Sequence, residues 1–179
     1  MFVAIDLPDN LKKTITETIS DLKKLNLIEG NFVGRENLHL TLKFLGEVPD
    51  KAAEKVSAVL TEVTKLTRKF PIELKGLGHF DERVLWIGSP ENKDIVKMAN
   101  NIDEKLSKLG FAKETRPFAI HLTLCRIKTI KNGKRFAELL ETSKEKSFGS
   151  FVADKITLMK STLGEEGAVY SKLADFALI

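Results

Sequence analysis

The sequence predicts a mixed fold of strands and helices in which one strand–helix–strand–helix–strand unit occurs twice. Three observations support this prediction. Short apolar or alternating segments, typical of strands, are followed in turn by segments whose apolar residues recur at helical spacing. Pro8-Asp9-Asn10 returns 82 residues later as Pro90-Glu91-Asn92, and His39-Leu-Thr-Leu returns at the same offset as His121-Leu-Thr-Leu. The 179 residues are 42% hydrophobic and 30% charged, an ordinary balance for one globular domain.

The first unit opens with an apolar run, Phe2–Leu7, which predicts a buried strand. A helix follows, with Asp9 or Asn10 as its N-cap. Its core face consists of apolar residues at helical spacing: Leu11, Ile15, Ile19 and Leu22. Strict alternation then predicts a strand over Leu38–Leu45, which ends at Gly46.

A second helix is expected after Pro49-Asp50. Its apolar face comprises Val56, Leu60, Val63 and Leu66. Pro71–Leu77 and Arg83–Gly88 are predicted to pair as strands around a loop that contains His79. A third helix follows, and Gly110 stands where a left-handed residue ends a helix. The apolar face of this helix comprises Ile95, Ala99, Ile102, Leu106 and Leu109.

The second unit continues with a strand over Phe118–Ile127 and a turn at Asn132-Gly133. A short helix is expected over Phe136 and Leu139–Leu140. Lys155–Leu163 and Val169–Leu178 then predict a terminal hairpin that turns at Glu165-Glu166-Gly167. No Pro/Gly/Ser-rich linker separates the two units, so residues 1–179 are expected to form a single domain of two closely packed lobes. The repeat indicates either a duplication that has drifted or a pseudo-symmetric fold.

The two repeated strands carry polar residues on one face. Because side chains alternate along a strand, each histidine shares a face with the threonine two residues later. Alternation predicts that His39, Thr41 and Lys43 share one face of the first strand. It predicts in the same way that His121, Thr123 and Cys125 share one face of the second strand. If a pseudo-twofold axis relates the halves, both His-Thr pairs face one groove.

Two histidines and two threonines in one groove suit chemistry at phosphorus. The unperturbed imidazole pKa near 6.5 fits both a general acid and a general base. The hydroxyls of Thr41 and Thr123 can donate hydrogen bonds to non-bridging phosphate oxygens. This chemistry requires no metal or other cofactor, and the chain lacks metal-binding spacings of the His-Glu-x-x-His type. The alternative is that both histidines are structural residues at strand ends, but recurrence of the whole motif favours function.

The basic segment Arg126–Arg135 holds five cations and no acid, in a chain of net charge +4. Arg126 lies five residues after His121 and could bind a phosphate. Strict alternation places it on the opposite face, so this role requires a bulge or a strand end. Phe118 is a candidate for stacking on a base, although an ordinary core position is the better explanation for it. His79 lacks a partnering threonine and is expected to be a loop residue.

Several classes of protein are excluded. The single cysteine, Cys125, cannot form an internal disulfide, and this fits a reducing cytoplasm. No apolar run approaches the roughly 20 residues that span a bilayer. An acid already at Asp6 argues against a signal peptide. A monomer is expected because the sequence shows no heptad pattern.

Five segments resemble the RNA 2′,3′-cyclic phosphodiesterases, formerly called 2′-5′ RNA ligases, of the two-histidine phosphoesterase superfamily. The resemblance covers nearly the whole chain, and the paired His-x-Thr motifs at this spacing are its most specific part. The segments are Met-Phe-Val-Ala-Ile-Asp-Leu-Pro, Glu-Asn-Leu-His39-Leu-Thr41-Leu-Lys-Phe-Leu-Gly-Glu-Val, Gly-Leu-Gly-His-Phe, Arg-Val-Leu-Trp and Arg116-Pro-Phe-Ala-Ile-His121-Leu-Thr123-Leu-Cys-Arg126.

The resemblance implies an α+β fold of two lobes, each with a mostly antiparallel sheet, around a central groove. It also implies hydrolysis of an RNA-terminal 2′,3′-cyclic phosphate to a 2′-phosphomonoester. His39 would donate a proton to the leaving 3′ oxygen, and His121 would accept one from water. Thr41 and Thr123 would hold the phosphate, and Arg126 would contact the substrate.

The chain departs from the family pattern at two places. Relatives usually carry proline before the second histidine, where this chain has Ile120, and many carry tryptophan where it has Phe32 or Val33. Both departures concern groove shape and not the chemistry. Two other functions stay open at this point. One is 2′-5′ ligation of RNA ends, such as tRNA halves, at the same site, and the other is RNA binding without catalysis.

Overall fold

The structure, a computed structural model, describes residues 1–164 and 167–179. Its strands are β1 (Phe2–Asp6), β2 (Ile28–Phe32), β3 (His39–Phe44), β4 (Phe70–Lys75), β5 (Leu77–Phe80), β6 (Val84–Ile87), β7 (Leu122–Ile130), β8 (Ser147–Ala153), β9 (Lys155–Gly164) and β10 (Gly167–Ala177). Its helices are α1 (Asp9–Leu25), α2 (Asp50–Thr64), α3 (Lys93–Ser107) and α4 (Gly133–Thr142), with a 3₁₀ turn η1 (Arg35–Asn37) before β3.

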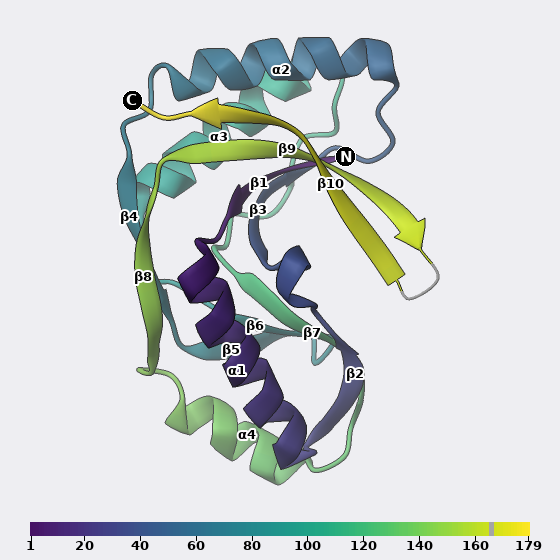
Figure 1. The fold of residues 1–179 in the computed structure, drawn as a ribbon, viewed down its shortest axis with the longest axis vertical. Coiled ribbons are helices and arrows are strands. Elements are labelled where there is room, and N and C mark those ends of the chain that lie inside the picture. Colours follow the sequence, from purple (N-terminus) through teal and green to yellow (C-terminus); the bar gives the residue numbers. More distant parts are fainter. Residues whose placement is uncertain (165–166) are drawn as a thin grey trace.

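The strands confirm the predicted α+β fold with antiparallel sheets. An eight-stranded sheet runs in the order β10-β9-β1-β3-β7-β6-β5, with β2 also paired to β7, and β4 and β8 form a second sheet. β3 and β7 lie next to each other at its centre. Figure 1 shows α2 and α3 at one end of the molecule and α1 and α4 at the other. α2 lies against β9 and β10 of the large sheet and α3 against β3, whereas α1 lies against β8 of the second sheet.

The 82-residue offset relates these elements in space as well as in sequence. It maps β1 onto β6, α1 onto the region of α3, β3 onto β7 and α2 onto the region of α4. β1 pairs with β3, and their counterparts β6 and β7 also pair. The two His-Leu-Thr-Leu strands are thus equivalent members of two similar units that meet at the centre of the sheet.

The predicted pairing of Pro71–Leu77 with Arg83–Gly88 is wrong. β4 pairs with β8, and β5 pairs with β6 instead. The chain changes direction at Gly76, which has a φ of 77° that favours glycine, so β4 and β5 are separate strands. Asp81 and Glu82, both with positive φ, make the tight turn between β5 and β6.

Most helix predictions are confirmed, with three differences at the ends. Pro8 occupies the N-cap of α1, and neither predicted residue caps that helix. Leu66 and Leu109 lie beyond the ends of their helices and are exposed. Gly110 has the expected left-handed conformation, with a φ of 91°.

The predicted terminal hairpin is confirmed as β9 and β10, which pair antiparallel. Residues 165 and 166 of its predicted turn lie outside the described residues. The strand predicted over Phe118–Ile127 begins only at Leu122 and runs to Ile130. β2 and β8 are additional strands that the sequence patterns do not predict. β2 extends the sheet beside β7, where the site lies.

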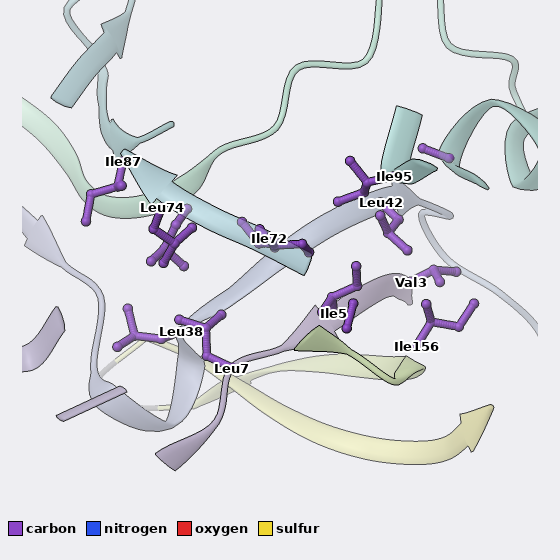
Figure 2. Close-up of a cluster of buried hydrophobic side chains, with 14 of the residues drawn as sticks. Val3, Ile5, Leu7, Leu38, Leu42, Ile72, Leu74, Ile87, Ile95 and Ile156 are labelled. Carbon is purple, nitrogen blue, oxygen red and sulfur yellow. The ribbon is translucent and has the colours of Figure 1, made fainter. Parts of the chain in front are cut away.

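Most of the buried hydrophobic side chains form one cluster that draws on both units. Figure 2 shows residues from β1, β3, β4, β6, α3 and β9 converging on it, among them Ile5, Leu42, Ile72 and Ile87. The leucines of both His-Leu-Thr-Leu segments belong to this cluster and are almost fully buried. They pack β3 and β7 against the core, and the histidine and threonine of each motif lie on the opposite, partly exposed face.

Candidate active site

The two repeated strands carry the same irregularity. In β3, Thr41 and Lys43 lie opposite consecutive residues of β1, so Leu42 has no partner. In β7, Leu124 is left without a partner on β6 in the same way. A bulge of this kind turns the following side chains to the other face of the strand. In β3, Leu42 and Lys43 are therefore both buried and Phe44 is exposed. In β7, Leu124 and Cys125 are both buried and Arg126 is exposed.

The bulges change which side chains accompany the histidines. Lys43 and Cys125, predicted on the histidine faces, both turn into the core, so that prediction is wrong. Phe44 and Arg126 turn toward the histidine face in their place. The bulge that Arg126 needs in order to reach the side of His121 is thus present in β7.

Lys43 is almost fully buried, and its charge is compensated. Its ammonium group lies 2.5 Å from a carboxylate oxygen of Asp103 and donates a hydrogen bond to the carbonyl of Ala112 at 2.8 Å. A buried charge is tolerated when it is paired and hydrogen-bonded in this way. At the equivalent place in β7, burial raises the pKa of the Cys125 thiol to about 11, so the thiol stays protonated and unreactive at neutral pH.

Both His-Thr pairs line one groove with a volume of about 870 Å³. β3 and β7 pair at one position, between the leucines that follow the two histidines. In an antiparallel pair this register directs His39 toward Thr123 and Thr41 toward His121. The four polar side chains therefore lie together at the centre of the sheet, as the pseudo-twofold arrangement predicts.

Both imidazoles are held by the same local hydrogen bond. Nδ1 of His39 lies 2.7 Å from the carbonyl oxygen of Asn37, and Nδ1 of His121 lies 2.8 Å from that of Ala119. Because a carbonyl only accepts, Nδ1 carries the proton in each ring. Nε2 is then the nitrogen left for chemistry. In His39 it lies 3.1 Å from the hydroxyl oxygen of Thr41.

Aromatic rings surround the two histidines unequally. His39 packs against Phe2, at a ring-centroid distance of 4.8 Å, and meets the edge of Tyr170 at 5.3 Å. His121 meets Phe80 edge to face at 5.0 Å. His39 is therefore enclosed between β1 and β10, where Tyr170 forms part of the groove wall.

The enclosure of His39 affects its titration. Burial is the main cause that lowers the pKa of its imidazole, and the charges of Lys12 and His121 act in the same direction. The hydrogen bond to Asn37 and the charge of Asp6 oppose this effect. Burial thus favours the neutral form of His39, and a bound anion would favour the protonated form.

Arg126 lines the groove, exposed, beside the His-Thr pairs and opposite Asn31 of β2. Phe118 has a different location. It is half-buried, packs against the core and lines a neighbouring cavity of about 1000 Å³ that also reaches His121. Of the two residues predicted to bind substrate, Arg126 lines the groove with all four polar residues, and Phe118 lines the neighbouring cavity, which shares Thr41 and His121 with the groove.

Phe44 is a candidate that the sequence analysis did not identify. Its side chain is 60% exposed, which is unusual for a phenylalanine beside a core strand. It lines both the His-Thr groove and the neighbouring cavity. The signal was present in the sequence, because the 82-residue offset that aligns the histidines also aligns Phe44 with Arg126.

His79 lies in β5 and not in a loop, and its role is structural. Its Nδ1 accepts a hydrogen bond from the backbone N–H of Glu82 at 3.0 Å, which closes the turn between β5 and β6. At the two departures from the family pattern, Phe32 and Val33 line the groove and Ile120 packs against the core.

Within residues 1–164 and 167–179, no three His, Cys, Asp or Glu side chains gather in a way that could hold a metal ion. No helix in this part of the chain is long and apolar enough to cross a membrane.

Two equivalent His-x-Thr strands that meet in one groove define a two-histidine phosphoesterase. The chain belongs to the LigT-like phosphoesterase family, whose sequence profile matches residues 5–86 and again residues 87–170. This double match divides the chain into the same two units as the internal repeat.

Relatives with assigned activities cover nearly the whole chain. An RNA 2′,3′-cyclic phosphodiesterase of Methanocaldococcus jannaschii is 39% identical over 98% of this chain and 99% of its own. One of Archaeoglobus fulgidus is 33% identical over 98% of each chain. The crystal structure of E. coli LigT in its apo form covers 99% of this chain and 95% of its own, with 26% identity and a TM-score of 0.80. These relatives identify the chain as a hydrolase of the phosphoesterase class.

Proposed function

We propose that this protein hydrolyses the terminal 2′,3′-cyclic phosphate of RNA to a 2′-phosphomonoester. The observation that carries the proposal is the single groove lined by His39, Thr41, His121 and Thr123. The names of the relatives support the substrate class, and E. coli LigT, 25% identical in that structure, has been crystallised with 3′-AMP.

The groove supplies an acid and a base on two sides of a bound phosphate. Nε2 of His121 accepts a proton from a water molecule as its oxygen attacks phosphorus. The bond from phosphorus to the ribose 3′ oxygen breaks, and protonated Nε2 of His39 gives its proton to that oxygen. The product is a 2′-phosphate with a free 3′-hydroxyl, and the two histidines have exchanged protonation states.

Thr41, Thr123 and Arg126 bind the phosphate in this mechanism. The hydroxyls of Thr41 and Thr123 donate hydrogen bonds to the non-bridging oxygens, on which negative charge increases in the transition state. Arg126 provides a guanidinium group at the side of the groove, where it can pair with the phosphate. None of these steps requires a metal ion or an organic cofactor.

The direct test uses a nucleoside 2′,3′-cyclic phosphate and a short RNA that ends in one, both with EDTA present. We expect turnover of both substrates at the same rate with and without EDTA, and a 2′-phosphate as the product. A 3′-phosphate product would contradict the direction of ring opening. Loss of activity in EDTA that Mg²⁺ or Mn²⁺ restores would contradict the metal-independent mechanism.

The pH dependence tests the role of His39 as the acid. His39 can donate a proton only while its imidazole is protonated, so catalysis is lost as the pH rises through the pKa of this ring. Burial lowers that pKa in the free enzyme. The anionic substrate raises it again. We therefore expect the basic limb of kcat/KM, which reports the free enzyme, to lie at lower pH than the basic limb of kcat. Coincident limbs, or the reverse order, would contradict the assignment.

Phe44 is proposed to stack on the base of the terminal nucleotide. Such stacking contributes about 1–3 kcal/mol per base, so Phe44→Ala should raise KM by roughly 5- to 150-fold for a cyclic nucleotide. It should not affect ribose 2′,3′-cyclic phosphate, which has no base. Phe118→Ala is the matched comparison from the other cavity. If Phe118→Ala alone discriminates between the two substrates, the base stacks there and not on Phe44.

A further inference from the structure

Asn37, the last residue of η1, connects His39 to the β9–β10 hairpin. Its carbonyl accepts the hydrogen bond from Nδ1 of His39 at 2.7 Å. Its side-chain amide donates a hydrogen bond to the carbonyl of Ala168 on β10 at 2.9 Å. Its backbone N–H donates a hydrogen bond to the carbonyl of Gly34, the N-cap residue of η1. The backbone of Asn37 thus holds the imidazole of His39, and its side chain is anchored to a residue 131 positions away in the sequence.

Among residues 1–164 and 167–179, no such anchor is seen for the second histidine. The 82-residue offset places Ala119 at the position of Asn37, and the carbonyl of Ala119 holds His121 at 2.8 Å. A methyl side chain cannot donate a hydrogen bond, so this carbonyl is held only by the chain around it. Each imidazole also makes one edge-to-face contact, His39 with Tyr170 of β10 and His121 with Phe80 of β5. The two halves are therefore similar in backbone but differ in how firmly each imidazole is oriented.

We propose that Asn37 is a positioning residue for the general acid, which it holds in a productive orientation by tying η1 to β10. This inference rests on the proposed function, in which His39 donates the proton to the leaving oxygen. A general acid acts only if the N–H of Nε2 points at that oxygen, and rotation of the ring would misdirect it. The attacking water, in contrast, can adjust its position to that of His121.

Loss of the anchor should also alter the titration of His39. The groups that face this ring are Asp6 on the paired strand β1, Lys12, which lies 2.7 Å from a carboxylate oxygen of Asp6, and His121 and Tyr170 across the groove. The carbonyl of Asn37 favours the protonated ring. A carbonyl that is free to move favours it less, so the basic limb of the pH profile should move to lower pH.

The experiment compares Asn37→Ala and Asn37→Asp with the wild type, on a nucleoside 2′,3′-cyclic phosphate. Both changes remove the donor to Ala168, and aspartate does so at nearly constant volume. Because a carboxylate near the ring favours its protonated form, the shift of the basic limb to lower pH is expected for Asn37→Ala and not for Asn37→Asp. We expect kcat to fall roughly 10- to 100-fold, the range for a misplaced reacting group, with KM nearly unchanged. The exposed Asn10→Ala is the matched control, and urea unfolding of each variant verifies that it is folded.

A double-mutant cycle separates positioning from a general structural effect. If Asn37 acts through His39, Asn37→Ala should cause no further loss in a His39→Ala background, measured in single turnover with excess enzyme. An equal loss in both backgrounds, a change in KM alone, or wild-type activity of folded Asn37→Ala would overturn the inference. A different result, full activity of His39→Ala, would contradict the proposed function itself.

Discussion

Replacement of either groove histidine by alanine is expected to lower kcat/KM for a cyclic nucleotide by about 10²–10⁴-fold. This corresponds to roughly 3–5 kcal/mol of transition-state stabilisation. In the proposed mechanism, His39→Ala removes the proton donor to the leaving oxygen, and His121→Ala removes the base that activates water. Steady-state kinetics at several pH values measures both effects. Each variant should also lose one limb of the pH profile: the basic limb with His39→Ala and the acid limb with His121→Ala.

The chain offers a control of the same residue type. His79→Ala removes the third histidine, which closes a turn and does not line the groove. It should retain nearly wild-type kcat/KM, with some loss of stability. If His39→Ala or His121→Ala lost less than tenfold while the protein stayed folded, the role assigned to that histidine would be wrong. If both lost the same limb of the profile, the division into acid and base would fail.

The sequence predicts the centre of this site well because the motif is local. Alternation along a strand depends only on neighbouring residues, so His39 and Thr41 share a face whatever surrounds them. The 82-residue repeat then implies that the second pair meets the first. The internal symmetry supplies long-range information that a single motif lacks, and the elements of the two units do correspond in the structure.

The misassigned residues depend on contacts between distant segments. The bulges at Leu42 and Leu124 arise from pairing with β1 and β6, which periodicity within one strand does not reveal. They decide that Lys43 is buried and that Arg126 reaches the groove. The anchor at Asn37 likewise requires the position of β10, far along the chain. Sequence reasoning therefore identifies the chemical groups, and tertiary pairing decides which of their neighbours assist them.

The two threonines should have large but unequal effects. Thr→Val keeps the shape of the side chain and removes the hydroxyl. The loss of one donor to a developing phosphate charge costs about 10²–10³-fold in kcat. We expect Thr123→Val to show this loss and little else, because no hydrogen bond of its hydroxyl to another described side chain is seen. KM should change little, since the donors act mainly on the transition state.

Thr41→Val should differ because its hydroxyl oxygen also lies 3.1 Å from Nε2 of His39. This contact gives the imidazole nitrogen a polar partner, and valine would leave it against an apolar surface. An unpartnered polar group disfavours the charged ring further, so the basic limb of kcat/KM should move to lower pH in Thr41→Val but not in Thr123→Val. Equal pH profiles in the two variants would mean that the contact between Thr41 and His39 has no influence on the acid. A loss below tenfold in both would remove the threonines from the binding of the phosphate and leave that role to Arg126.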